Sequence, residues 1–391
     1  MTSYYARHLE TAIKAHFKKY KEVLVLLGAR QVGKTTLLKK CLKDAYFLSV
    51  DNEPVRQNLE RYDIAVYKQL LPVGIKEVVI DEIHLLSNPG RAAKIIHDQM
   101  PEVKLIITGS SSLQIKSRAS ESLAGRKIDY FLYPLTFSEI LYQKGVEKEL
   151  NFQIWKNFEG EDQQERFHPF DVRGILESIL VFGQYPAMMD RPSDEKYLLN
   201  LVDSVIFKDL LELKTIANRP AALSLLRLLA YQIGSLANKA ELANRLRVDI
   251  ATVSRYLSLF EQSLIIFPLR PFTGRARDEI GKMSKFYFYD VGLRNALIEN
   301  FQPLNSRTDY GILFENFIVS EILKINAYLD LGLKMHFWRT KQGSKIDLVL
   351  INREGKICAV EIKTGKERLN HAFLNRYPRA KIKTVTPNNF Y

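Results

Sequence analysis

Fold class follows from one stretch of the sequence, Leu24-Val25-Leu26-Leu27-Gly28-Ala29-Arg30-Gln31-Val32-Gly33-Lys34-Thr35-Thr36. An apolar run comes first, a loop bracketed by two glycines follows, and a helix-forming segment ends the stretch. The spacing Gly-x-x-x-x-Gly-Lys-Thr is that of a phosphate-binding P-loop. Gly28 and Gly33 permit backbone angles and close approaches that a side chain would block. The stretch therefore predicts a strand, a phosphate-binding loop and a helix.

Each residue type in this loop has an expected role. Backbone N–H groups from Arg30 to Thr35 point inward and cradle the β-phosphate, with added positive potential from the helix N-terminus. Lys34 bridges the β- and γ-phosphates, and the Thr35 hydroxyl holds Mg²⁺. The alternative is a glycine-rich turn that binds no ligand. The predicted ATP-binding residues are Gly28, Ala29, Arg30, Gln31, Val32, Gly33, Lys34, Thr35 and Thr36.

Composition limits the class of protein. A chain of 391 residues is too long for one compact core and suggests two or three domains. With 46% hydrophobic and 26% charged residues, it reads as an ordinary globular protein of the cytoplasm. No apolar run approaches the roughly 18 residues of a membrane helix. Cys41 and Cys358 show no ligand-like or disulfide-like spacing, which favours a reducing compartment.

The second half of a nucleotide site follows downstream. An apolar strand beginning at Val78 ends in Asp81 and Glu82, so Asp81 is expected to join the Mg²⁺ shell and Glu82 to activate the attacking water. The next buried strand ends at Thr108, which is expected to contact the γ-phosphate, with Ser110 as the alternative.

Two arginines follow those strands. Arg118 and Arg126 are candidates for an arginine finger, acting within the chain or from a neighbouring subunit. The alternative for each is an ordinary surface arginine.

These motifs together resemble a known prokaryotic family. The P-loop, the strand Ile80–His84 and the run Thr-Gly-Ser-Ser-Ser…Ser-Leu-Ala-Gly-Arg look like the AAA-type ATPases that carry an AAA_14 domain and a C-terminal DUF4143 domain. The segments Phe182–Pro186 and Phe286–Leu293 also fit, although Gln184 stands where that family often has a glycine. The resemblance implies ATP binding and an AAA-like α/β core.

We expect an α/β chain with four parts. A P-loop NTPase domain covers residues 1–140, and a helical linker or lid covers residues 141–220. A winged helix-turn-helix covers residues 221–290. A restriction-endonuclease-like α/β domain covers residues 291–391.

The helix-turn-helix prediction rests on spacing. Asn238 can cap a helix over 239–246, and Asp249 can cap a second helix over 250–262, with a three-residue turn between them. Strands at 264–269 and 285–289 flank a basic loop that resembles a wing. Such modules also serve as packing platforms, so DNA contact is one of two interpretations. The candidate DNA-binding residues are Thr252, Ser254, Arg255, Arg275 and Arg277.

The C-terminal part follows the order of a PD-(D/E)xK nuclease core. Glu315 lies on an expected helix, Asp347 opens an expected strand, and Glu361 and Lys363 close the next one. Carboxylates around Mg²⁺ and a lysine that orients water suit phosphodiester hydrolysis. Alternation along a strand places Glu361 and Lys363 on one face. The alternative is a degenerate fold with solvated charges at the strand ends.

Charge favours a polyanionic partner. The net charge is +13, and residues 331–391 hold 13 Lys or Arg against 4 Asp or Glu, which leaves +9. The leading hypothesis is an ATPase whose nucleotide state controls a DNA-binding or nuclease-like C-terminal half, with ATP and Mg²⁺ as cofactors. The alternatives are an ATP-dependent switch that binds protein partners, and an ATP-gated nuclease. Homo-oligomers are compatible with the sequence, and no membrane contact is expected.

Overall fold

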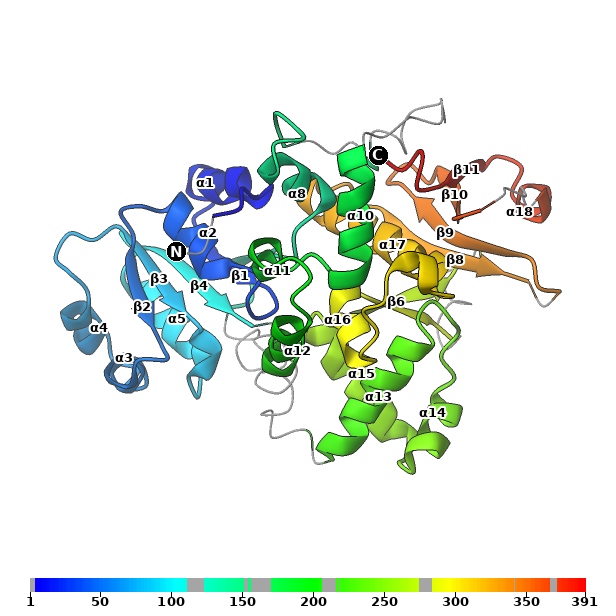
Figure 1. Ribbon diagram of the computed structural model, residues 1–391. Helices are drawn as coiled ribbons and strands as arrows, with labels where there is room; N and C mark the ends of the chain where they lie inside the picture. Colours follow the sequence, from blue (N-terminus) through cyan, green and yellow to red (C-terminus); the bar gives the residue numbers. More distant parts are fainter. Residues whose placement is uncertain are drawn as a thin grey trace. The chain divides into compact units, whose positions relative to one another are not determined.

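The computed structural model describes residues 4–110, 123–150, 154–155, 170–205, 216, 218–273, 283–340, 342–365 and 371–391. The chain divides into two compact units (Figure 1). The N-terminal unit comprises Met1–Tyr133 with Ser204–Leu213 and Gln262–Leu264, and the C-terminal unit comprises Pro134–Asp203, Lys214–Glu261 and Ile265–Tyr391.

A five-stranded sheet in the order β2-β3-β4-β1-β5 forms the centre of the N-terminal unit, and every pair of neighbours is parallel. Parallel strands covered on both faces read as continuous apolar runs, and all five residues of β1 are buried. The strands are β1 (Val23–Leu27), β2 (Tyr46–Ser49), β3 (Glu77–Asp81), β4 (Lys104–Gly109) and β5 (Lys127–Phe131).

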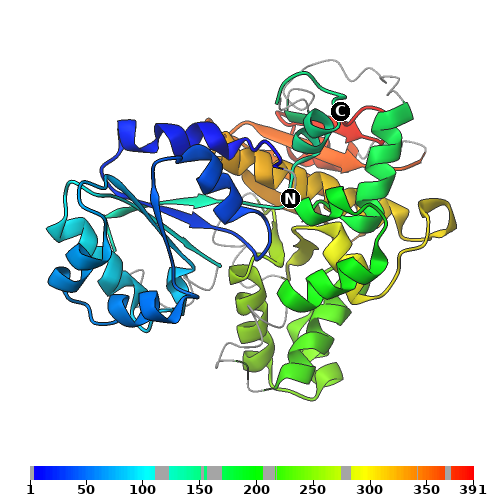
Figure 2. The same cartoon turned by 60° about the vertical axis from the view of Figure 1, so that its left-hand side comes forward.

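Helices cover both faces of this sheet (Figure 2). The chain passes from β1 across two strands to β2 and then returns through β3 to β4, so right-handed crossovers place α2 and α5 on opposite faces. The helices are α1 (Leu9–Lys19), α2 (Lys34–Cys41), α3 (Glu53–Leu59), α4 (Ile64–Leu70), the short 3₁₀ helix η1 (Ile83–Leu85) and α5 (Pro89–Gln99). The predicted α/β core is confirmed, and its sheet is parallel.

The C-terminal unit combines helices with a six-stranded mixed sheet in the order β11-β10-β9-β8-β6-β7. Its strands are β6 (Ile266–Pro271), β7 (Lys285–Phe288), β8 (Lys334–Arg339), β9 (Lys345–Ile351), β10 (Ile357–Ile362) and β11 (Lys381–Val385). Its helices are α8 (Phe137–Gln143), α10 (Phe170–Phe182), α11 (Pro186–Asp190), α12 (Glu195–Asp203), α13 (Arg219–Tyr231), α14 (Lys239–Leu246), α15 (Ile250–Gln262), α16 (Val291–Leu297), η4 (Leu304–Ser306), α17 (Tyr310–Tyr328) and α18 (His371–Arg376).

The two helices of the predicted helix-turn-helix are present as α14 and α15, but a separate winged-helix domain is not confirmed. The β6–β7 hairpin pairs through β6 with β8, where Arg270 lies opposite His336. The hairpin is therefore the edge of the C-terminal sheet, and the predicted boundary between residues 290 and 291 falls inside one unit. Local sequence patterns predict that β6 and β8 are strands, but their pairing across some 65 residues is set by tertiary packing.

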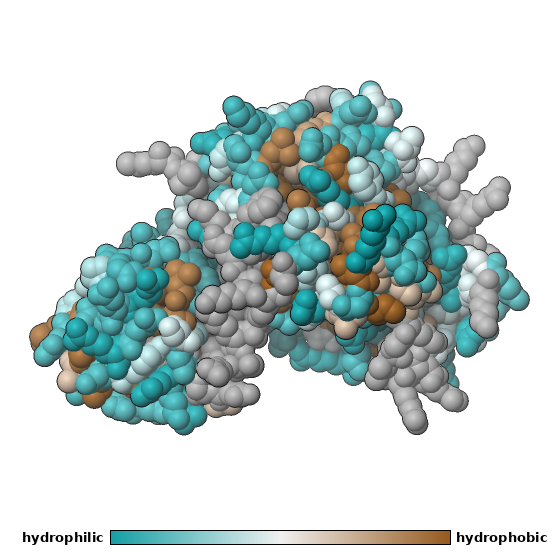
Figure 3. Space-filling view, turned by 90° about the horizontal axis from the view of Figure 1, so that it is seen from below, coloured by the Kyte–Doolittle hydropathy of each residue, from teal (hydrophilic) through white to brown (hydrophobic). Residues whose placement is uncertain are grey.

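Surface chemistry is ordinary for a globular chain. On the face shown in Figure 3, most visible residues of each unit are hydrophilic, and apolar residues form separate small patches. Within the described ranges, no helix is both long and apolar enough to span a bilayer.

A buried polar network joins three segments of the C-terminal unit. Lys324 and Glu321 of α17 form a fully buried ion pair with an N–O distance of 3.0 Å. The Lys324 ammonium also donates to the Leu135 carbonyl (3.1 Å) and to Gln184 Oε1 (3.0 Å). The Glu321 carboxylate accepts from the Phe137 backbone N–H (2.9 Å) and from Gln184 Nε2 (2.9 Å). Each charge is therefore compensated, and α17 is tied to the start of α8.

Lys324→Met should destabilise the C-terminal unit. The variant removes one charge of a fully buried pair and leaves the Glu321 carboxylate uncompensated, which costs about 3–5 kcal/mol. Urea unfolding followed by circular dichroism measures the effect. The matched control is Lys334→Met, at an exposed lysine of β8, which should shift the unfolding midpoint little. Equal midpoints for the two variants would contradict a stabilising role of the network.

Candidate functional site

The P-loop follows β1 directly, and its glycines are there for steric reasons. A Cβ on Gly28 would lie 2.5 Å from the Leu132 carbonyl oxygen, so only glycine fits. Gly33 has a φ of 97° and precedes α2 as its N-cap. Gln31 has a φ of 62°, a left-handed conformation that is uncommon for a non-glycine residue. The loop is therefore held in a conformation that places its backbone above the N-terminus of α2.

Lys34 is 95% buried, and its ammonium group lies under the loop. It donates to the carbonyl oxygens of Gly28 (2.9 Å) and Ala29 (3.2 Å). Arg7, also buried, donates to the Val32 carbonyl (2.9 Å) and adds a second positive charge behind the loop. Two buried cations and a helix N-terminus beside the loop suit a polyphosphate, which is a strongly negative ligand.

Helix α2 and the ends of β3 and β4 bring together three oxygen-bearing side chains where magnesium is predicted. The Thr35 hydroxyl donates to Asp81 Oδ2 (2.7 Å), and the Thr108 hydroxyl donates to Asp81 Oδ1. The Glu82 backbone N–H donates in turn to Thr108 Oγ1 (3.0 Å). A hydroxyl and a carboxylate are hard oxygen ligands that fit Mg²⁺ when phosphate oxygens and water complete its shell. The predicted Thr35–Asp81 pair thus converges, and Thr108 touches the same carboxylate.

No group of three or more His, Cys, Asp or Glu side chains in the described ranges is arranged to hold a metal ion by itself. Magnesium at this position would therefore depend on the nucleotide for its remaining ligands, as expected for a metal that arrives with ATP.

Glu82 lies at the end of β3 in a left-handed backbone conformation, with a φ of 56°. Its Oε2 atom is 3.1 Å from His84 Nδ1, and the other ring nitrogen of His84 is 3.3 Å from the Ser110 hydroxyl. Sequence reasoning missed His84. The signal was its position two residues after the acidic pair, on a turn short enough to bring both side chains together.

Arg126 does not lie at the phosphate end of the sheet. Its carbonyl accepts from the N–H of Val23, the first residue of β1, whereas the P-loop follows the last. Its guanidinium pairs with Asp98 at the end of α5 (3.0 Å). The prediction that Arg126 contacts the γ-phosphate within its own chain is therefore wrong. Because β5 runs parallel to β1, Arg126 lies at the N-terminal ends of the strands, and the P-loop lies at their C-terminal ends. Arg118 lies outside the described residues.

The C-terminal unit brings three of the four nuclease-like residues together. Strands β9 and β10 pair antiparallel with Leu348 opposite Val360, so Asp347 and Glu361 come next along the two strands. Lys363 Nζ lies 3.5 Å from both Asp347 Oδ2 and Glu361 Oε2. The ammonium group thus stands between the two carboxylates that a metal would need.

Lysines and burial set the charge state of Asp347. Burial favours the protonated carboxyl, but Lys345 (3.4 Å), Lys363 and the Ile362 backbone N–H (3.1 Å) outweigh it and lower the pKa of Asp347 below its usual value. Asp347 is therefore ionised at neutral pH, as a metal ligand would have to be.

Glu315 is engaged by a strand that sequence reasoning assigned to the wing. Its Oε1 atom accepts from the Tyr287 hydroxyl (2.6 Å) and from Lys285 Nζ (3.1 Å). Burial and the Glu315 charge raise the pKa of Tyr287 well above its usual value, so the phenol stays protonated. Of the four residues expected to cluster, Asp347, Glu361 and Lys363 lie together. Glu315 is instead held by Lys285 and Tyr287. Alternating residues 285 and 287 on one face of a strand were the missed signal.

Of the five candidate DNA-binding residues, the structure describes the three on α15. Thr252 donates through its hydroxyl to Asp249 (2.9 Å), which caps α15, and Arg255 is exposed on the same helix. Ser254 lines a groove of about 580 Å³ between α15 and the β6–β7 hairpin. Arg275 and Arg277 lie outside the described residues.

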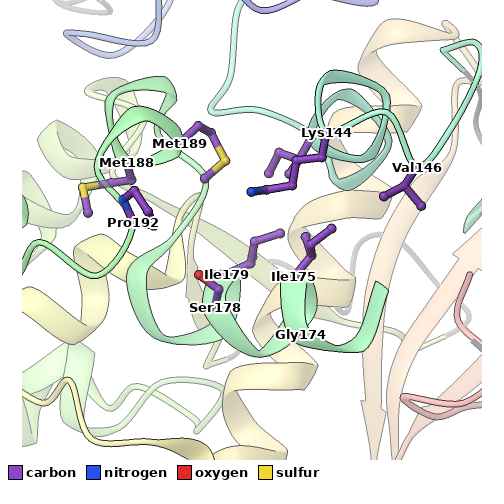
Figure 4. Close-up of a pocket in the computed structure, with 10 residues that line it drawn as sticks. Lys144, Val146, Gly174, Ile175, Ser178, Ile179, Met188, Met189 and Pro192 are labelled. Atoms are coloured by element: carbon purple, nitrogen blue, oxygen red, sulfur yellow. The ribbon is translucent and has the colours of Figure 1, made fainter. Parts of the chain in front are cut away.

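Another pocket, of about 500 Å³, lies among α8, α10 and α11 (Figure 4). Aliphatic and methionine side chains form its walls, including Ile175, Ile179 and Met189, and Lys144 extends toward them from the opposite side. This lining lacks the convergent donors that a triphosphate requires, so the P-loop remains the candidate nucleotide site.

Family models match three separate parts of the chain. An AAA domain (AAA_14) matches residues 20–141, which include the P-loop, Asp81 and Glu82. A domain of unknown function (DUF8612) matches residues 173–304, and another (DUF4143) matches residues 310–387. The match to DUF8612 was not expected from the sequence, and the nuclease-like assignment is not confirmed by these matches.

The curated relatives are distant but cover most of the chain. An uncharacterized protein of Haemophilus influenzae is 24% identical over 336 residues, which cover 81% of this chain and 78% of the relative. An uncharacterized protein of Methanocaldococcus jannaschii is 26% identical over 375 residues, which cover 89% of this chain and 76% of the relative.

Solved structures are less similar. A STAND (signal transduction ATPase with numerous domains) protein with a tetratricopeptide repeat sensor from Pyrococcus horikoshii aligns with a TM-score of 0.33 and 14% identity, over 83% of this chain and 46% of that chain. This score is too low to indicate a shared overall fold. The motifs, the geometry and the family matches together show that the chain carries an AAA-type P-loop domain in its N-terminal part and a DUF4143 domain at its C-terminal end.

Proposed function

We propose that this protein binds ATP with Mg²⁺ at the P-loop, hydrolyses it, and through its nucleotide state controls a C-terminal half that engages nucleic acid. The observation that carries the ATPase part is the convergence of Thr35, Asp81 and Thr108, which come from three different segments, beside the buried Lys34 ammonium. A structural turn would not require a buried lysine and an acid–hydroxyl cluster at the same strand ends.

The chemistry divides among these residues. Lys34 and the loop N–H groups hold the β- and γ-phosphates, and Thr35 with Asp81 would hold Mg²⁺, which neutralises charge developing on the phosphate oxygens. Glu82 takes a proton from the attacking water as general base. Thr108 fixes the position of Asp81 and of the Glu82 backbone, so that base and metal ligand keep a constant separation.

For the C-terminal half, net charge supports a polyanionic partner. Residues 331–391 carry +9, and Arg255 is exposed on α15. Phosphate contacts release counterions, so binding to DNA should weaken steeply as salt rises. If the partner is instead a protein, the chain should bind DNA of any sequence weakly or not at all, even at low salt.

Lys34→Ala should abolish ATP binding or weaken it by at least about a hundredfold, because a buried cation that meets two phosphates is lost. Isothermal titration with ATP·Mg²⁺ measures the affinity. Lys39→Ala, at an exposed lysine of the same helix, is the matched control and should bind normally. Unchanged affinity in Lys34→Ala would refute the nucleotide site.

Glu82→Gln should bind ATP with near-normal affinity and hydrolyse it about a hundredfold more slowly or worse, since an amide cannot accept the proton from water. Phosphate release under saturating ATP gives the rate. Glu77→Gln, at the first residue of the strand that ends just before Glu82, controls for the loss of a carboxylate. Normal turnover in Glu82→Gln would mean that another group is the base.

Magnesium-dependent cleavage of nucleic acid is the second candidate function. The adjacent Asp347 and Glu361 carboxylates with Lys363 at 3.5 Å from each favour it. The same lysine competes with a metal for those oxygens, which favours the alternative of a charge-balanced core that binds without cutting.

Asp347→Asn tests this second candidate. If the site cleaves, the variant should lose Mg²⁺-dependent cutting of linear DNA by about a hundredfold or more while ATP hydrolysis continues, since only one metal ligand changes. Asp330→Asn, at an exposed acid of the same unit, should cut as the wild type does. Wild-type protein that binds DNA and leaves it intact identifies the cluster as a core and removes nuclease activity from the proposal.

A further inference from the structure

His84 lies between the proposed general base and the end of the neighbouring strand. Its Nδ1 atom is 3.1 Å from Glu82 Oε2, and its Nε2 atom is 3.3 Å from the Ser110 hydroxyl. Both side chains of the first pair are largely buried, with 14% of His84 and 25% of Glu82 exposed. The ring is thus packed against the carboxylate that the proposed mechanism uses.

The backbone explains why residue 84 returns to residue 82. Glu82 has a φ of 56°, so the chain turns sharply after β3 and enters the short helix η1. The Glu82 N–H is held by Thr108, and Ser110 comes two residues later along the end of β4. Ser110 directly follows Gly109, the last residue of β4. The end of β4 therefore contacts this turn twice. Thr108 accepts a hydrogen bond from the Glu82 backbone N–H, and Ser110 contacts the His84 ring that lies beside the Glu82 side chain.

The contacts define the proton positions on the ring. Two lone pairs would repel at 3.1 Å, so Nδ1 carries the proton, and its N–H lies beside the Glu82 carboxylate without the alignment of a hydrogen bond. In the neutral ring, Nε2 is then the acceptor, and the Ser110 hydroxyl can donate to it. A glutamate side chain has several rotatable bonds, and a general base must lie within hydrogen-bond reach of its water. The positive N–H end of the imidazole ring, 3.1 Å away, limits the positions that this carboxylate can take.

We propose that His84 is a positioning residue for ATP hydrolysis, which holds the Glu82 carboxylate toward the attacking water and links it through Ser110 to the strand that carries Thr108. This inference rests on the proposed function, in which Glu82 is the base. His84 itself touches neither nucleotide nor metal in this role, so it acts on turnover and leaves nucleotide affinity unchanged.

Two amide substitutions separate the two ring contacts. The amide nitrogen of asparagine occupies about the place of Nδ1 and preserves the donor toward Glu82. The amide of glutamine reaches about the place of Nε2 and preserves only the contact with Ser110. We expect His84→Asn to keep kcat within about threefold of the wild type, and both His84→Gln and His84→Ala to lower it about tenfold, because the close polar contact with the Glu82 carboxylate is lost. KM for ATP and the melting temperature should stay constant in all three.

Two controls sharpen the result. His97 also lies beside an acid in the same unit, with its Nδ1 atom 3.0 Å from Asp98, and His97→Ala should leave kcat unchanged. In a Glu82→Gln background, His84→Ala should cause no further loss, because a positioning residue has nothing left to position.

The outcomes distinguish the inference from the proposed function. Hydrolysis that requires Lys34 and Glu82 but is indifferent to all His84 variants overturns the inference alone. Equal losses in His84→Asn and His84→Ala, or a fall in melting temperature that tracks the loss of kcat, overturn it too, because either would indicate a packing role. Wild-type protein without ATP hydrolysis overturns the proposed function, and this inference with it.

Discussion

The Asp81 carboxylate accepts two hydrogen bonds from hydroxyls, one from Thr35 and one from Thr108, and the arrangement of the nucleotide domain depends on this convergence. Thr35 lies in the first turn of α2, the helix that follows β1. Asp81 ends β3 and Thr108 is next to last in β4, so the carboxylate joins α2 to the ends of two strands. Because β4 lies between β1 and β3, the three groups can meet only when all the strands are parallel and in register. One carboxylate thereby fixes the distance from the P-loop to the proposed base at Glu82.

Positive charge is handled differently in the two units. Behind the P-loop, Lys34 and Arg7 are buried against backbone carbonyls, which leaves two cationic groups near the place of the phosphates. In the C-terminal unit, lysines instead face carboxylates within the protein, as Lys363 does between Asp347 and Glu361. The first arrangement places two cations beside a loop shaped for an anion, whereas in the second lysines and carboxylates of the protein face one another. This contrast is the physical reason for placing nucleotide chemistry first and cleavage second in the proposed function.

The hairpin of β6 and β7 changes the view of how the C-terminal unit is built. Its strands extend the sheet that carries Asp347, and Lys285 and Tyr287 from β7 bind the Glu315 carboxylate on α17. Residues predicted to form a wing therefore hold Glu315, one of the four residues of the predicted nuclease-like set. The helices α14 and α15 belong to the same unit, so a nucleic acid held by α15 and a reaction at the strand ends would involve a single folded body.

The sequence by itself determined the local elements with strong periodicity or special backbone needs. Strand β1, the P-loop glycines, the acidic end of β3 and the helices α14 and α15 were all predictable, because apolar runs, glycine and capping residues act within a few positions of the chain. Only the tertiary structure decided where Arg126 lies, since parallel pairing with β1 placed the start of β5 at the N-terminal ends of the strands, opposite the P-loop. It also decided that Lys285 meets Glu315 and that His84 meets Glu82. These contacts depend on strand order and on one left-handed residue, and such long-range or strained geometry leaves no periodic signal in the sequence.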